Sequence, residues 1–184
     1  MTLATPLILI GYFPRKVSRD VDHLRDAGVT AIRSASSCIS QAPFDARFPD
    51  VAGAFWTLPT IAEAAATVPA DEREQHEIHA YRMLPALFDN GMRRPFEMPP
   101  IEVEPLPAGY ISAGFDAVSC VHYERQIECS PLSCNCMASE YEVNEHCLLP
   151  TLEAAEAAAL WFSDARSGVE PGPYVVLEVL WWPA

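Results

Sequence analysis

Tyr174-Val175-Val176-Leu177-Glu178-Val179-Leu180-Trp181 is the stretch of sequence that decides the fold. It is a short apolar run rich in β-branched and aromatic residues, which is typical of a strand buried on both faces of a sheet. The turn sequence Pro171-Gly172-Pro173 comes directly before it. We therefore expect a central β-strand over residues 174–181.

The clearest helix signal precedes this strand. Thr151 follows Pro150 and has the residue type of an N-cap, and Glu153 stands in the first turn, where a negative charge is favourable. Gly168 is a typical stop signal. The apolar face of this helix is predicted to consist of Leu152, Ala155, Ala159 and Phe162.

The first part of the chain has a similar alternation of elements. Residues 7–13 are an apolar run closed by Pro14, residues 18–27 have helical spacing and end at Gly28, and residues 29–34 are again strand-like. This order predicts a start resembling a βαβ unit. A short helix is expected after Pro59, through residues 61–67, followed by another helical turn at residues 69–75.

Residues 76–88 fit two interpretations. As a helix they place His76 and His79 on one face, and as a strand they place these histidines on opposite faces. Pro85 disfavours a helix interior, and Asn90-Gly91 is typical of a hairpin turn. We therefore favour a strand over residues 78–84.

The middle of the chain holds five prolines within residues 95–107, which predicts an extended crossover. Strands are expected at residues 115–121 and 141–149, on either side of a cysteine-rich loop. The sum is an α+β fold, with a mixed sheet and a few helices packed against it. The length of 184 residues favours one compact domain over residues 1–184.

Charge limits the possible partners. The net charge of −13 argues against binding nucleic acid or an anionic membrane surface, and it favours a basic protein partner. The apolar run at residues 7–10 is too short for a signal peptide, and no run is long enough to cross a membrane. We therefore expect a cytoplasmic protein with reduced cysteines.

The cysteine-rich loop offers a candidate metal site. Thiolates and imidazoles are the preferred ligands of zinc, which takes four of them in a tetrahedron. The spacing is unusual, because the loop contains no Cys-x-x-Cys pair. The candidate ligands are Cys129, Cys134, Cys136, His146 and Cys147, with Cys38 as a possible extra ligand.

Three other interpretations of these cysteines stay open. They fit the role of small buried apolar residues, which is common for cysteine. They also fit a disulfide or redox pair. Finally, Cys129 or Cys134 could be a nucleophile, which would need His122 or His146 as a base and Asn135 or Asn144 to orient that base.

Several stretches resemble a group of small bacterial proteins of uncharacterised function. These are residues 128–135, 144–148 and 170–174, with a looser match at residues 11–13 and 38–40. The resemblance implies a single domain and a bacterial source. It implies no activity and no catalytic residue.

Two functions follow as hypotheses. The first is a non-enzymatic, acidic protein-binding domain, similar to an immunity or adaptor protein, and we prefer it because no recognisable catalytic motif is present. The second is a zinc or reactive-thiol site in the cysteine-rich loop.

Overall fold

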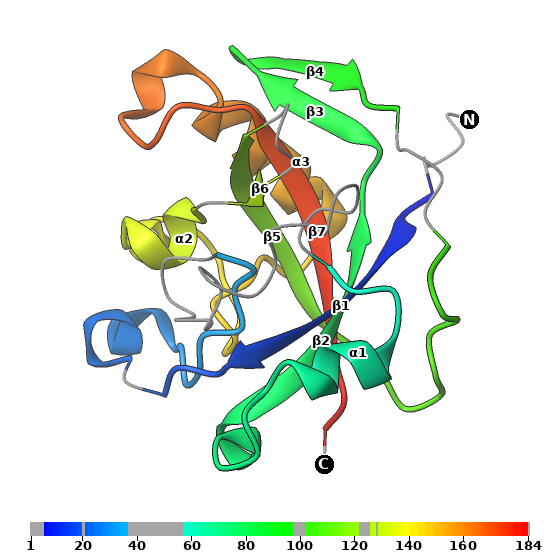
Figure 1. The fold of residues 1–184 in the computed structure, drawn as a ribbon. Coiled ribbons are helices and arrows are strands. Elements are labelled where there is room, and N and C mark those ends of the chain that lie inside the picture. Colours follow the sequence, from blue (N-terminus) through cyan, green and yellow to red (C-terminus); the bar gives the residue numbers. More distant parts are fainter. Residues whose placement is uncertain are drawn as a thin grey trace.

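Strand β7 (Tyr174–Trp181) lies at the centre of the sheet, as the sequence predicts, and its residues are buried from Tyr174 through Leu180. Strand β5 (Ile111–Val121) pairs along one edge of β7. Strands β2 (His76–Met83) and β3 (Ala86–Asp89) pair one after the other along its opposite edge (Figure 1). The computed structural model describes residues 6–19, 21–36, 57–97, 102–121, 126–127 and 129–183.

Three outer strands extend these pairings. Strand β1 (Ile8–Lys16) pairs with β2, strand β4 (Met92–Pro95) with β3, and strand β6 (Gln126–Ile127) with β5. Every strand pairing in the described part of the chain is antiparallel. The α+β class and the single compact domain are confirmed, whereas the expected mixture of parallel and antiparallel strands is not found.

The expected strands at residues 29–34 and 141–149 are both wrong. These two segments are loops that bind each other, because the backbone N–H groups of Thr30 and Ala31 both donate to the carbonyl of Glu145, at 2.9 and 3.1 Å. Each segment makes only an isolated bridge elsewhere among the described residues. Several of their apolar side chains, among them Val29, Ile32 and Leu149, are buried in the core although their backbones form no sheet strand, so the apolar pattern reflects burial and not strand pairing.

The helices are short, and α1 and α3 begin where the sequence predicts, whereas the helix expected over residues 18–27 is a 3-10 helix that begins only at Asp22. Thr60 caps α1 (Ile61–Ala66) by accepting a hydrogen bond from the Glu63 N–H at 3.1 Å, and Thr151 caps α3 (Leu152–Phe162) in the same way. Helix α3 ends at Phe162, earlier than expected. The remaining helical elements are α2 (Pro131–Cys134) and the 3-10 helices η1 (Asp22–Ala27), η2 (Arg73–Gln75), η3 (Met137–Ser139) and η4 (Ala165–Ser167).

The breaks between β2 and β3 and between β3 and β4 lie where the sequence predicts. Residues 76–88 form strands rather than a helix, and Pro85 lies in the break between β2 and β3. Asn90 and Gly91 both have positive φ, 51° and 70°, as a type I′ turn between β3 and β4 requires. The proline-rich crossover predicted over residues 95–107 begins inside β4, which ends at Pro95, and its other described residues, 96–97 and 102–107, have no regular structure.

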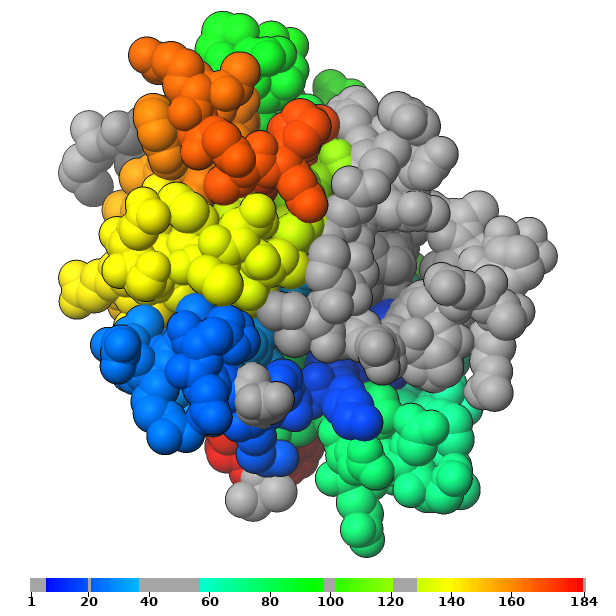
Figure 2. All heavy atoms as spheres, turned by 90° about the vertical axis from the view of Figure 1, so that its left-hand side faces the viewer, coloured from blue at the N-terminus to red at the C-terminus, as the bar shows by residue number. Residues whose placement is uncertain are grey.

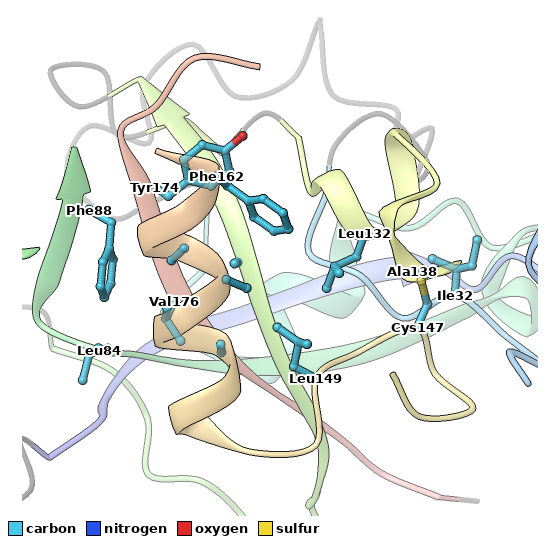
Figure 3. Packing of buried hydrophobic residues seen from close by; sticks show 14 of the residues in the cluster. Ile32, Leu84, Phe88, Leu132, Ala138, Cys147, Leu149, Phe162, Tyr174 and Val176 are labelled. Atoms are coloured by element: carbon cyan, nitrogen blue, oxygen red, sulfur yellow. The ribbon is translucent and has the colours of Figure 1, made fainter. Parts of the chain in front are cut away.

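The core has three clusters. The first lies between α3 and the sheet, where Phe162 packs on Tyr174 with ring centroids 5.8 Å apart (Figure 3). The third lies under α1, whose Ala64 is fully buried near Tyr12. The second is built on alternate residues of β7 and their neighbours; its largest members include Ile10, Phe13, Tyr81, Met83, Leu148, Val175, Leu177 and Val179.

Candidate functional site

The cysteine-rich loop, defined in the structure as residues 129–149, lies against the segment of residues 21–36 on one face of the molecule. Figure 2 shows the loop in yellow between that segment, in blue, and the end of α3, in orange. Pro131 occupies the first turn of α2, where its missing N–H costs nothing. Leu132 is fully buried in the first core cluster, so α2 is held by its apolar side chain.

The structure separates the predicted ligands by burial. Cys129 and Cys147 are buried, Cys134 is half-buried and Cys136 is exposed. Cys38 lies outside the described residues. None of the five described cysteines is joined to another of them by a disulfide.

Cys147 is part of the first core cluster, beside Ile32 and Ala138 (Figure 3). Burial, with smaller contributions from the charges of Asp116, Cys134 and Cys136, raises the pKa of its thiol to about 12. The thiol is therefore protonated at neutral pH and acts as a small apolar group. Its position fits the core interpretation of the cysteines.

Cys134 has polar surroundings. Its Sγ lies 2.9 Å from Oγ of Ser36, which is fully buried, so the thiol touches the segment that packs under the loop. Cys129 donates a weak hydrogen bond to the side-chain oxygen of Asn135, at 3.8 Å.

His146 contacts Arg33 and Trp181. Its Nδ1 lies 2.8 Å from Nη1 of Arg33, and its ring packs edge-on against Trp181 with centroids 5.6 Å apart. Burial lowers the pKa of His146, and the charge of Arg33 lowers it further. The imidazole is therefore neutral at pH 7 and accepts a hydrogen bond from Arg33 at Nδ1.

The geometry does not assemble a metal centre from the described residues. No group of three or more His, Cys, Asp or Glu side chains is placed to hold a metal ion in this part of the chain. With His146 bound to Arg33 and Cys147 in the core, zinc binding would require these side chains to rearrange or Cys38 to complete the set.

The structure instead reveals a buried polar network that the sequence did not indicate. Arg33 donates two parallel hydrogen bonds to the carboxylate of Glu77, both at 2.9 Å, and its guanidinium lies 3.9 Å from the ring centroid of Trp181. Bidentate pairing and stacking are the two geometries that favour arginine over lysine.

The network continues along β2 to β1. His79 lies 3.0 Å from Glu77, Tyr81 lies 3.4 Å from His79, and Arg15 donates to the hydroxyl of Tyr81 at 3.2 Å. Burial lowers the pKa of His79, while its contact with Glu77 opposes this shift. A neutral His79 donates from Nε2 to Glu77 and accepts at Nδ1 from Tyr81.

Asp116 of β5 is a second buried polar centre. Its carboxylate accepts hydrogen bonds from the hydroxyls of Ser34 and Ser130, at 2.7 and 2.6 Å, and from the N–H of Ala35 at 2.9 Å. Burial raises the pKa of Asp116, and these hydrogen bonds lower it in part. One carboxylate thus joins the sheet, the segment below the loop and the start of α2.

The acidic end of the loop is also held firmly. The side chain of Asn144 donates to the carbonyl of Ala113 at 2.6 Å and accepts from the N–H groups of His146 and Leu148 at 2.9 and 3.2 Å. The N–H of Arg33 donates to the carbonyl of His146 at 3.1 Å. The loop is therefore fixed to β5 on one side and to residues 30–33 on the other.

No protein-family model, curated protein or solved structure matches this chain. The resemblance to a group of bacterial proteins therefore stays a prediction. No helix in the described ranges is both long and apolar enough to span a membrane.

Proposed function

We propose that the protein is a non-enzymatic binding domain whose cysteine-rich loop presents an acidic surface to a basic protein partner. One observation carries this proposal: the loop backbone is fixed on two sides, while its glutamates remain exposed. We define the loop acidic surface as Glu140, Glu142 and Glu145. A surface held in place before binding loses less conformational entropy when a partner docks.

The buried charges strengthen this proposal because they do not reduce the charge of the surface. Arg15 and Arg33 are buried, and so is Asp116, while Glu77 is paired with Arg33. With Asp116 ionised, these two positive and two negative groups cancel. The net charge of −13 is then carried outside this network, where it attracts a basic partner and speeds association.

A basic toxin or effector, bound in the manner of an immunity protein, is the kind of partner that fits, and we propose the cytoplasm as the place of binding. The tagged protein would be used at low salt to isolate a partner from its native host. The purified pair would then be titrated across a salt series. Because exposed charges are screened at high ionic strength, the affinity should fall at least about tenfold between 0.05 and 0.5 M salt. Isolation of no partner, or an affinity insensitive to salt, would contradict the proposal.

A matched pair of variants locates the interface. The first, E140Q/E142Q/E145Q, neutralises the loop acidic surface. The second, E63Q/E102Q/E104Q, removes the same number of charges near α1, where Glu104 accepts a hydrogen bond from the N–H of Ile61 at 3.2 Å.

We expect the loop variant to weaken binding about tenfold or more and the α1 variant to weaken it less than threefold. Equal losses would show that only the overall charge matters. An unchanged affinity in both variants would show that the glutamates do not form the contact.

A thiol site is the second candidate, and the contact between Cys134 and Ser36 favours it. The neighbouring Cys136 is exposed, so a dithiol or a metal ion at Cys134 and Cys136 would be within reach of solvent. Thiol labelling of the native protein tests for a reactive dithiol, because a reactive cysteine must label much faster than a buried one.

Elemental analysis of protein purified without added metal tests for a bound metal ion. Zinc in the set Cys129, Cys134, Cys136, His146 and Cys147 would give about one ion per chain. A content near zero, together with slow labelling of Cys134 and Cys136, would remove this candidate.

A further inference from the structure

A pocket lies between α1 and the beginning of β2, on the opposite side of α1 from its buried residue Ala64. Its volume is about 350 Å³, at the lower end of the range for small-molecule sites. Figure 1 shows α1 beside β2, with the connection between them curling below. The lining residues are Ala62, Ala65, Ala66, Val68, Arg73, His76 and Ile78.

The pocket exists because α1 has small side chains on this face. Ala62, Ala65 and Ala66 are spaced three and four residues apart, which places them side by side on one face of the helix. The opposite side of α1 packs through Ala64 against the third core cluster. Larger side chains on the outer face would fill the space, so its volume follows from the sequence of α1.

The polar side chains of the pocket are Arg73 and His76. Arg73 forms no ion pair within the described ranges of the chain, although Asp71, Glu72 and Glu74 flank it in sequence. The Nδ1 of His76 lies 2.9 Å from the carbonyl of Glu72 and donates to it. This bond fixes the orientation of the imidazole at the pocket wall.

From this geometry we infer that the pocket binds a small carboxylic acid with an apolar tail, such as a medium-chain fatty acid. The alanines, Val68 and Ile78 would surround the tail, and the guanidinium of Arg73 would bind the carboxylate. An unpaired guanidinium suits a carboxylate because its N–H groups match the two oxygens. This inference is independent of the proposed protein partner, since the loop acidic surface is formed by other residues.

Octanoate, 1-octanol and acetate are the probes, titrated into the full-length chain by calorimetry and by amide NMR shifts. Octanoate should bind, 1-octanol should bind about tenfold more weakly because it lacks the carboxylate, and acetate should not bind measurably. The shifted amides should belong to α1 and to residues 73–78. Equal affinity for octanoate and 1-octanol, or no binding of octanoate at millimolar concentration, would overturn the inference.

Two variants separate the contributions of charge and space. R73Q should weaken octanoate about tenfold and leave 1-octanol unchanged, whereas R25Q, at an exposed arginine of η1, should change neither. A66L should abolish binding of both, because leucine fills the pocket from an exposed helix position without disturbing the core. The circular dichroism of each variant confirms folding. Unchanged octanoate affinity in folded R73Q or A66L would refute the site.

Discussion

Neutralising Glu77 with the substitution Glu77→Gln tests the buried network most directly. Burial alone raises the pKa of Glu77, but hydrogen bonds from His79 and Arg33 and their charges lower it to about 2, from an ordinary value of 4.5. One pKa unit corresponds to about 1.4 kcal/mol, so the ionised carboxylate stabilises the fold by at most about 3 kcal/mol. The buried His79 is neutral at pH 7, so the positive charge that stabilises the Glu77 carboxylate comes from Arg33. We therefore expect E77Q to lower the free energy of unfolding by about 1–3 kcal/mol.

The sign of the pH dependence follows from linkage. A carboxylate whose pKa is lowered in the folded chain stabilises it above the unfolded value of 4.5, and this contribution is lost as the pH falls toward about 2. Urea denaturation followed by circular dichroism should show E77Q less stable than the parent chain at pH 7. About half of the difference should be gone by pH 3.

The exposed Glu142 provides the matched control, since E142Q removes the same charge without breaking a buried pair. Its stability should stay within about 0.5 kcal/mol of the parent chain. If E77Q and the parent chain unfold at the same urea concentration at pH 7, the Arg33–Glu77 pair does not stabilise the fold. A difference that is the same at pH 7 and pH 3 would show that packing, not charge, is responsible.

Three further predictions test other parts of the structure. D116A leaves buried donors without an acceptor and should lower the free energy of unfolding by about 3–5 kcal/mol. D116N should lower it less, and equal losses for the two variants in urea denaturation would contradict the hydrogen-bond argument. In native thiol labelling, Cys136 should react at least about a hundredfold faster than Cys147, and similar rates would show that Cys147 is not in the core. G11A should destabilise the fold by at least about 2 kcal/mol, measured by thermal unfolding. The reason is that Gly11 has φ +134° and an added Cβ would lie 2.6 Å from the carbonyl oxygen of Leu58. An unchanged melting temperature would show that the backbone relaxes.

The sequence predicted elements whose signals are local. Thr60 and Thr151 have the N-cap residue type and serve as N-caps, and Asn90-Gly91 makes the turn that its chemistry favours. The run of β7, which is apolar except for Glu178, is buried on both faces as its composition favours.

The sequence did not reveal which apolar segments would be strands. Residues 29–34 bury Val29 and Ile32, yet their backbone binds another loop, because burial of a side chain and pairing of a backbone are separate requirements. For the same reason the fold class was predictable, but the absence of parallel pairings from the described sheet was not.

The candidate site was predicted even less completely. Cys134, His146 and Cys147 were expected to act together, but Cys134 contacts Ser36, His146 is bound to Arg33 and Cys147 lies in the core. The network from Arg33 to Glu77 joins positions far apart in the chain, and no spacing rule connects them. Asp116 carried a weak signal, as a carboxylate at an inward position of an alternating strand.

The order of the strands along the chain has a consequence for synthesis. Strand β7 follows β2, β3 and β5, yet it supplies the central partner of all three. While the chain emerges from the ribosome, the pairs β1–β2, β3–β4 and β5–β6 cannot be joined into one sheet until β7 has been made. Pairings of such long sequence separation form slowly. Unfinished chains therefore expose their apolar strands, and a chaperone that shields them would be needed most just before residues 174–181 emerge.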